Sequence, residues 1–375
     1  MKVVRVKESV SKLAEYKPAR SIVEVSREYG IKEKDLIKLA GNENRFGCSE
    51  NVIKAINDSK TYFSYYPDVN VTKLREKLSE KLNVPGKNLI FGNGSFELLT
   101  LIGETYIEKD DEVIYNDPSF GWYLNVTLKN EGTVVRVPVT EEKAVDTQGI
   151  LKKINEKTKV IWLCNPNNPT GTVIAPVVLT DFIERVPEHV LIVLDEAYID
   201  FIDGDYVDTI ELAQKHSNVI ILRTFSKSYG LASFRVGYGI ASEDIIRNLL
   251  KVKLPINLSF TAQVAALAAL EDEEFTEFVI SKNRKELGRY YSEFEALGLK
   301  YIPSNGNFIL VRTGLDGEYV ETEFAKEGII IRKGEEFGLD KWLRISVGRP
   351  EENSRVIELL KKILEEKRKN DRKNA

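Results

Sequence analysis

The sequence predicts an α/β protein, with a large domain built on a mostly parallel, seven-stranded sheet sandwiched by helices, and a smaller α+β domain. Seven short apolar runs, rich in Val and Ile, lie between residues 88 and 242 and alternate with longer stretches. Such alternation is typical of parallel strands joined by crossover helices. After about residue 243 the pattern changes to helical segments followed by further strand-like runs. A length of 375 residues allows two domains of roughly 100–200 residues each.

The strands of the large domain are expected where the apolar runs are continuous, because strands buried on both faces have this pattern. The runs are 88–94, 111–118, 132–139, 158–165, 189–196, 218–225 and 235–242. The stretches between them are long enough for helices that cross from one strand to the next, as at 96–109, 144–156 and 175–188.

The remaining segments predict a small domain and an N-terminal arm. Residues 260–297 have a helical pattern, strand-like segments follow at 299–313, 328–333 and 342–347, and a helix is expected from 350 to about 368. We therefore divide the chain into an arm (1–35), a large domain (36–270) and a small domain (271–375). The arm is amphipathic, and we expect it to pack on the small domain or on a partner subunit.

Composition argues against several classes of function. The 54 basic and 58 acidic residues leave a net charge of -4, which does not suit a broad nucleic-acid-binding surface. Two Cys and two His are too few for a disulfide framework, and they argue against a zinc site or a Ser-His-Asp triad, so we predict no metal. No apolar run approaches the roughly 18 residues that span a bilayer, and the N-terminus has no apolar core. We expect a cytoplasmic protein whose proton chemistry rests on Lys, Tyr, carboxylates or a cofactor.

Polar residues follow several of the predicted strands, at the edge where open α/β sheets bind ligands. Lys227 lies in the segment TFSKSYG after the run 218–225. It is either an ordinary surface lysine or a Schiff-base lysine, which requires a partly desolvated amine near anion-binding groups. Arg235, eight residues later, can hold a phosphate in a fork geometry.

Two further strand ends carry candidate ligand-binding residues. Asp195 ends an apolar run, where a buried carboxylate is costly without a cationic partner such as a protonated pyridine nitrogen. The alternative interpretation is that Asp195 is the N-cap of a helix. Asn168 lies in NPNNPTG at 165–171, which is either a plain turn or a rigid loop that points the amide into a site.

The segment GNGSFE at 92–97 opens a predicted helix, and small residues at a helix N-terminus suit a phosphate. It resembles the start of a dinucleotide fingerprint, but Glu97 stands where the third Gly belongs. The aromatic residues of PSFGWY at 118–123 either cover a flat ring or pack in the core. Together the strand ends outline a pocket for a planar heteroaromatic that carries an aldehyde and a phosphate.

These segments, with DEAYIDF at 195–201 and TFSKSYGLASFRVGYGIA at 224–241, resemble the fold-type I pyridoxal-phosphate aminotransferases. The sequence is most similar to the histidinol-phosphate aminotransferase family, from Tyr16 to VGRPEEN at 347–353. The resemblance implies a transaminase of histidine biosynthesis that converts histidinol phosphate and 2-oxoglutarate to imidazole acetol phosphate and glutamate. It also implies pyridoxal 5′-phosphate as the cofactor.

The resemblance assigns a role to each matched cofactor residue. Lys227 would carry the cofactor as a Schiff base and then move the proton between the substrate Cα and the cofactor. Asp195 would keep the pyridine nitrogen protonated, and Tyr198 and Asn168 would hydrogen-bond the 3′-oxygen. Phe120 would stack on the ring. A cup for the phosphate would be formed by Gly94, Ser95, Phe96, Thr224, Ser226 and Arg235.

The resemblance also implies a homodimer with shared active sites. Tyr66 matches a tyrosine that reaches the cofactor phosphate of the neighbouring subunit. Tyr16 matches an N-terminal tyrosine contributed across the dimer to the substrate phosphate.

Substrate contacts are implied for four other residues. Arg344, in WLRISVG, would receive the substrate carboxylate or phosphate, and Arg332, in GIIIRKG, would be a second anion-binding arginine. Asn42, in AGNENRFG, would line the site together with Asn168.

The sequence departs from the family pattern at Phe96, where an acidic residue is common, at Arg45, where a proline is usual, and at 232–234, where a small Gly is replaced. Phe96 and Arg45 bear on the substrate more than on the chemistry. The alternatives within the superfamily are therefore an aromatic amino-acid aminotransferase and a threonine-phosphate decarboxylase. Outside it, a nucleotide-binding oxidoreductase is disfavoured by the missing third Gly, and a non-catalytic binding module does not need Lys227, Asp195, Asn168 and Tyr198 together.

Overall fold

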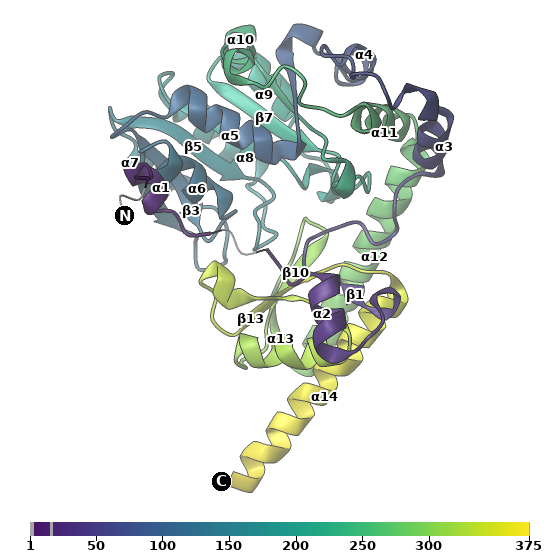
Figure 1. Cartoon of the computed structure of the whole chain (residues 1–375). Coiled ribbons are helices and arrows are strands. Elements are labelled where there is room, and N and C mark those ends of the chain that lie inside the picture. The colour runs from purple at the N-terminus through teal and green to yellow at the C-terminus, as the bar shows by residue number, and fades with distance from the viewer. Residues whose placement is uncertain (1–3, 16–17, 375) are drawn as a thin grey trace.

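The computed structural model of the chain describes residues 4–15 and 18–374 and places them in two units, each built on its own sheet. Figure 1 shows the larger unit above, the smaller one below it, and the C-terminal helix extending away from both. Within the described ranges no helix is both long enough and apolar enough to cross a membrane.

The large unit is organised by a seven-stranded sheet with the order β2-β8-β7-β6-β5-β3-β4. β8 is antiparallel to both of its neighbours, and the strands from β7 to β4 run parallel. This confirms the predicted fold class. The strands are β2 (Leu89–Gly92), β3 (Glu112–Asp117), β4 (Thr133–Pro138), β5 (Thr158–Cys164), β6 (Leu191–Asp195), β7 (Val219–Thr224) and β8 (Gly237–Ala241).

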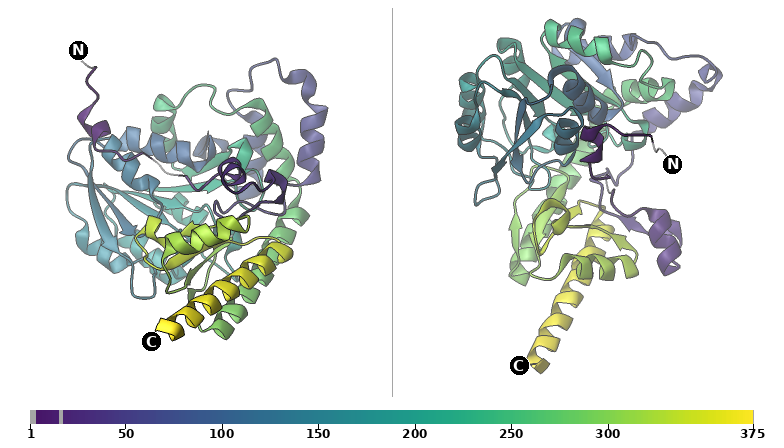
Figure 2. Two further views of the ribbon diagram at one scale, coloured as in Figure 1. Left: turned by 60° about the horizontal axis from the view of Figure 1, so that its bottom comes forward. Right: turned by 60° about the vertical axis from the view of Figure 1, so that its left-hand side comes forward.

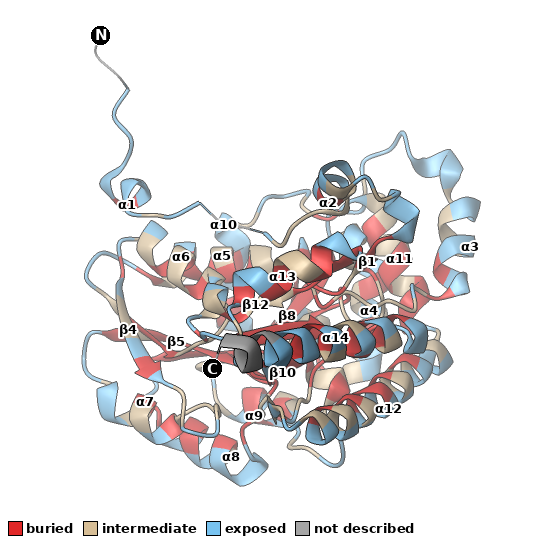
Figure 3. Ribbon diagram, turned by 90° about the horizontal axis from the view of Figure 1, so that it is seen from below, coloured by how far each residue is buried: buried red, intermediate tan, exposed pale blue. Residues whose placement is uncertain are grey.

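Helices cover both faces of this sheet because successive strand residues supply two separate apolar cores. On one face Ile161 and Ile192 pack under α4, α7, α8, α9 and α11, and on the other Trp162 and Val193 pack under α5, α6 and α10. Figure 3 shows the buried residues in red along the strands and the inner sides of the helices. The helices are α3 (Glu50–Asp58), α4 (Thr72–Leu82), α5 (Gly94–Tyr106), α6 (Trp122–Lys129), α7 (Thr147–Lys153), α8 (Pro176–Arg185), α9 (Thr209–Lys215), α10 (Glu243–Val252) and α11 (Phe260–Leu270), with short 3₁₀ turns η2 (Lys60–Tyr62), η3 (Gly86–Asn88), η4 (Ile199–Phe201) and η5 (Ala232–Phe234).

The small unit has an antiparallel sheet with the order β12-β13-β10-β9. Its apolar core lies between this sheet and its helices and includes Phe324, Ile345 and Leu360. The elements are α12 (Glu273–Leu297), β9 (Lys300–Ile302), β10 (Phe308–Arg312), α13 (Gly317–Lys326), β11 (Ile329–Ile330), β12 (Arg332–Lys333), η6 (Gly334–Phe337), β13 (Trp342–Ser346) and α14 (Pro350–Asn374).

The N-terminal segment contacts both units. α1 (Glu8–Ser11) lies against α6, whereas Val25 of α2 (Ile22–Tyr29) packs with Ala325 and Ile330 of the small unit. Figure 2 shows α1 beside the large unit and α2 beside the small one. After η1 (Glu33–Asp35), strand β1 (Ile37–Lys38) pairs in parallel with β11, so residues 37–38 join the small unit by their hydrogen bonds.

Candidate active site

The carboxyl ends of β5, β6 and β7 meet the start of α5 around a cavity of about 270 Å³. This position is the one expected for a ligand in an open α/β sheet. The cavity brings together most of the residues singled out from the sequence. It is lined by Gly41, Glu43, Ser95, Phe96, Phe120, Cys164, Asn168, Asp195, Ala197, Tyr198, Thr224, Ser226, Lys227, Ala232 and Arg235.

Asp195 ends β6 and is buried, with one carboxylate oxygen paired and the other not. Its Oδ2 accepts a hydrogen bond of 2.8 Å from the Tyr123 hydroxyl, and Tyr123 is itself stacked on Trp162. Its Oδ1 has no hydrogen-bond partner among the described residues. Burial raises the pKa of Asp195 to about 6. A buried carboxylate of this kind calls for a cation at Oδ1.

Lys227 lies in the loop after β7, and its amine points at the N-terminal segment of the chain. Nζ donates to the carbonyl oxygens of Gly41 and Asn42, each at 3.2 Å. Loss of water around the amine lowers the pKa of Lys227 to about 8. The amine is therefore neutral far more often than that of a surface lysine, as a nucleophile requires.

Backbone amides and hydroxyl groups form an anion cup beside the lysine. The Thr224 hydroxyl accepts a hydrogen bond of 3.1 Å from the Ser226 amide, and Arg235 Nη1 donates to Ser226 Oγ at 3.2 Å. α5 begins at Gly94, whose φ of +67° is left-handed, and a Cβ there would stand 2.4 Å from Arg235 Nη2. Glycine is thus required for the helix N-terminus and the guanidinium to lie side by side.

A chain of hydrogen bonds joins the large sheet to the small one across the cavity. The Tyr198 hydroxyl accepts from Asn42 Nδ2 at 3.0 Å and from Asn168 Nδ2 at 3.3 Å. Asn168 Oδ1 in turn accepts from Arg344 Nη1 at 2.6 Å. Asn42 also binds Ser346 through its backbone amide, at 2.8 Å. These contacts hold the two faces of the site in one network.

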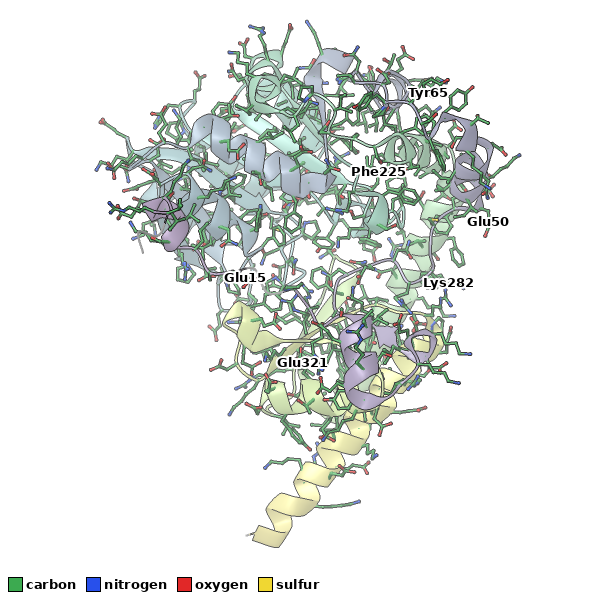
Figure 4. All side chains as sticks on the ribbon, in the orientation of Figure 1. Glu15, Glu50, Tyr65, Phe225, Lys282 and Glu321 are labelled. Carbon is green, nitrogen blue, oxygen red and sulfur yellow. The ribbon has the colours of Figure 1, made fainter. Side chains whose placement is uncertain are left out.

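A wider cleft of about 650 Å³ continues from the cavity toward the small unit and the N-terminal segment. Glu15, which is labelled in Figure 4 between the two units, lies at its edge. Arg332 on β12 and Arg344 on β13 both line it and are direct partners in the antiparallel pair. Arg332 forms an ion pair with Glu336. Phe96 also lines this cleft and packs its ring edgewise on Phe120, with centroids 5.0 Å apart.

Two residues singled out from the sequence, Tyr66 and Arg45, lie away from the cavity, and a third, Tyr16, is outside the described residues. Tyr66 is 87% exposed and lines neither cavity of the single chain. Arg45 turns away from the cleft and pairs with Glu352 of α14, with Nη2 and Oε1 2.6 Å apart.

Sequence reasoning missed the roles of Tyr123, Glu336 and Phe337. Tyr123 lies in the first turn of α6 and Phe120 just before that helix, with their ring centroids 5.6 Å apart, and the aromatic segment 118–123 was the signal that the sequence offered. For Glu336 and Phe337 no sequence signal exists, because their contacts depend on how η6 folds back over β12.

These residues fit pyridoxal phosphate. The unpartnered Asp195 Oδ1 suits a pyridinium nitrogen, the cup of Ser95, Thr224, Ser226 and Arg235 suits a phosphate, and Lys227 suits an aldehyde. Together with the fold they define a pyridoxal-phosphate-dependent enzyme of fold type I.

Comparison with known proteins is consistent with this class. The model of the family described as "Aminotransferase class I and II" matches residues 34–360, and the chain belongs to this family. It is 42% identical to the histidinol-phosphate aminotransferase of Geobacillus thermodenitrificans over 365 residues, covering 97% of this chain and 99% of that one. It is also 42% identical to histidinol-phosphate aminotransferase 2 of Carboxydothermus hydrogenoformans, covering 96% and 99%.

A solved structure is similar over almost the same length. The histidinol-phosphate aminotransferase of Sinorhizobium meliloti, in complex with pyridoxal-5′-phosphate, superposes with a TM-score of 0.89 at 27% identity, covering 97% of this chain and 99% of that one.

Proposed function

We propose that the protein transfers the amino group of histidinol phosphate to 2-oxoglutarate, with pyridoxal 5′-phosphate bound at Lys227. The observation that carries this proposal is the placement of two arginines, Arg332 and Arg344, in the cleft that Lys227 also lines. Both substrates of the reaction carry anionic groups, and paired guanidinium groups recognise carboxylates and phosphates. The relatives named for the same reaction support the choice of substrate.

In this proposal the Lys227 amine carries out the proton transfers. When bound, pyridoxal phosphate supplies the carbonyl that takes up the amine and an electron sink for the Cα bond that breaks. The Lys227 amine would remove the proton from the substrate Cα and donate a proton to C4′ of the cofactor. A pKa of about 8 suits both steps near neutral pH.

The surrounding residues hold the cofactor in one orientation. Asp195 would pair with the ring nitrogen through its unpartnered Oδ1, while the Tyr123 hydroxyl donates to Oδ2. Burial raises the pKa of Tyr198, so its hydroxyl keeps a proton to donate to the 3′-oxygen. Phe120 would pack on the ring, and the cup at the start of α5 would hold the phosphate.

The active form in this proposal is a homodimer. Tyr66 belongs to a group of exposed large apolar side chains from the end of η2 to the segment before α4, and exposed apolar groups of this kind can mark an interaction surface. The group consists of Tyr62, Phe63, Tyr65, Tyr66 and Val69. Tyr65, labelled in Figure 4, lies at the outer edge of the large unit. A partner placed here would bring each Tyr66 toward the other active site. Within each subunit we assign residues 36–270 to the cofactor unit, apart from β1, which pairs with β11 of the small unit, 271–375 to the small unit, and 1–35 to an arm.

The direct test is glutamate formation from histidinol phosphate and 2-oxoglutarate by the cofactor-loaded protein. Lys227→Ala is expected to lower kcat by about 10²–10⁴-fold or more, because it removes the general acid–base. The visible absorption of the bound cofactor should shift when glutamate is added to the wild type. Full transaminase activity of Lys227→Ala would contradict the mechanism.

The same assay separates the alternatives. A higher kcat/KM for phenylalanine than for histidinol phosphate would make the protein an aromatic amino-acid aminotransferase. Release of CO2 from threonine phosphate would make it a decarboxylase.

A further inference from the structure

Glu336 places a carboxylate inside the cleft, directly on one of the two arginines assigned to the substrate. It lies on η6, the short turn between β12 and β13, and forms an ion pair with Arg332. The side chains of Arg332 and Glu336 are 11% and 27% exposed, so the pair is largely desolvated on the arginine side. Both residues line the wide cleft together with Lys227.

The position of Arg332 explains why an anion is needed there. Arg332 and Arg344 are direct cross-strand partners on β12 and β13, so their side chains share one face of the sheet. Like charges directly opposite each other destabilise a sheet. The Phe337 ring contacts both guanidinium groups, with its centroid 5.4 Å from Arg332 Cζ and 5.0 Å from Arg344 Cζ. Arg344 donates to the neutral oxygens of Asn168 and Ala40, each at 2.6 Å, whereas Arg332 pairs with the charged Glu336.

We propose that Glu336 is an exchangeable counter-ion, which holds Arg332 in the substrate-free enzyme and is displaced by the anionic group of the substrate. This inference rests on the proposed function, because it assumes that Arg332 faces substrate anions. Displacement needs only a side-chain rotation, since Glu336 is partly exposed at the cleft.

The exchange sets how strongly an anion must interact with Arg332 before it gains net binding. A singly charged carboxylate that replaces Glu336 only restores the interaction that was lost. A doubly charged phosphate adds a further attraction to the pair of guanidinium groups. Because every anion must displace the same Glu336 carboxylate, a singly charged carboxylate gains little net binding at Arg332, whereas a phosphate keeps the part of its attraction that exceeds that of Glu336.

A neighbouring ion pair supplies a matched control. Lys333, the next residue on β12, forms an ion pair with Glu318 of α13, and neither of these residues lines the cleft. Glu318→Gln therefore breaks a comparable pair on the same strand without touching the cleft.

The experiment measures the binding of inorganic phosphate to the cofactor-loaded protein by titration calorimetry, with the cofactor cup already filled. Glu336→Gln is expected to bind phosphate about ten-fold more tightly than the wild type, because phosphate no longer competes with a charge-assisted hydrogen bond. Glu336→Ala should show the same direction, which guards against an effect of the new amide. Glu318→Gln should bind phosphate like the wild type, and the double variant Arg332→Gln with Glu336→Gln should lose the gain.

Substrate kinetics provide a second readout. In Glu336→Gln the KM values for glutamate and for histidinol phosphate should both fall several-fold and by a similar factor, because both anions are spared the same cost of displacing Glu336.

Unchanged or weaker phosphate binding in both Glu336 variants would overturn the inference, as would an equal gain in Glu318→Gln. If histidinol phosphate is not a substrate but phosphate binding still tightens in the Glu336 variants, the proposed substrate is wrong and the counter-ion stands.

Discussion

Replacing Asp195 by Asn is expected to stabilise the cofactor-free protein while it removes the activity of the loaded enzyme. The carboxylate is buried, and its Oδ1 has no hydrogen-bond partner among the described residues. In the absence of a pyridinium partner, the charge is therefore a cost to the folded state above its pKa. Asn keeps an oxygen that can accept the Tyr123 hydrogen bond and carries no charge.

The magnitude follows from the pKa. Burial raises the pKa of Asp195 from 3.8 to about 6 in the folded protein. The folded state binds this proton more tightly than the unfolded chain, so the contribution to stability is fully present below pH 3.8 and is lost as the pH rises through 6. The difference between a pKa of 3.8 and one of about 6 corresponds to a loss of about 3 kcal/mol in the free energy of unfolding. The buried NH2 group of Asn has no hydrogen-bond partner, which costs about 1 kcal/mol. The expected net increase in the free energy of unfolding is therefore about 2 kcal/mol at pH 7.5.

The assay is denaturant unfolding of the cofactor-free protein between pH 5 and 8. The wild type should lose stability across this range relative to Asp195→Asn, and the two curves should approach each other at the acid end. Glu196→Gln is the matched control, because this neighbouring buried carboxylate has a cationic partner, Arg223 Nε at 2.9 Å. Breaking that pair should destabilise the protein by about 3–5 kcal/mol.

The reasoning is refuted if Asp195→Asn is no more stable than the wild type at pH 7.5, or if the difference between them does not change with pH. Either result would mean that the carboxylate has a partner in the cofactor-free protein. Saturation with pyridoxal phosphate should reverse the order of stability, because only the wild-type carboxylate pairs with the pyridinium.

Three further predictions test other parts of the site. Tyr123→Phe removes the donor to Asp195 Oδ2 and should weaken cofactor binding about 10- to 100-fold in a fluorescence titration; an unchanged Kd would contradict the role of the hydroxyl. Gly94→Ala places a Cβ against Arg235 and should weaken cofactor binding strongly, whereas Gly121→Ala, with open space around its Cβ, should not. Arg45→Ala breaks the pair with Glu352 and should lower the free energy of unfolding by about 1 kcal/mol with no change in KM, since Arg45 does not line the cleft.

Much of the large sheet could be predicted because its signal is local. The run 189–196 became β6 (Leu191–Asp195), and the run 218–225 became β7 (Val219–Thr224). Strands buried on both faces need continuous apolar residues, and such residues are visible in the sequence. Helix limits were less certain, because they depend on caps. The helix expected at 96–109 begins at Gly94, where the left-handed backbone of that residue lets the chain turn directly out of β2.

The gathering of Lys227, Asp195 and Asn168 could also be anticipated, because parallel strands bring their carboxyl ends to one edge. Asn42 is different. It binds Ser346, which is 304 positions away in the chain, and the resemblance placed it in the site without indicating this contact.

The sequence alone therefore specified the large sheet and the positions of Lys227 and Asp195 at strand ends, because these follow from local pattern and topology. The chemistry that the two residues share follows from those positions. Packing set the rest. The hydroxyl on Asp195 Oδ2, the register that places Arg332 opposite Arg344, and the carboxylate of Glu336 on Arg332 all join segments whose approach no local pattern encodes. Their energies depend on distances of a few ångströms in a desolvated site, and only the folded chain defines those distances.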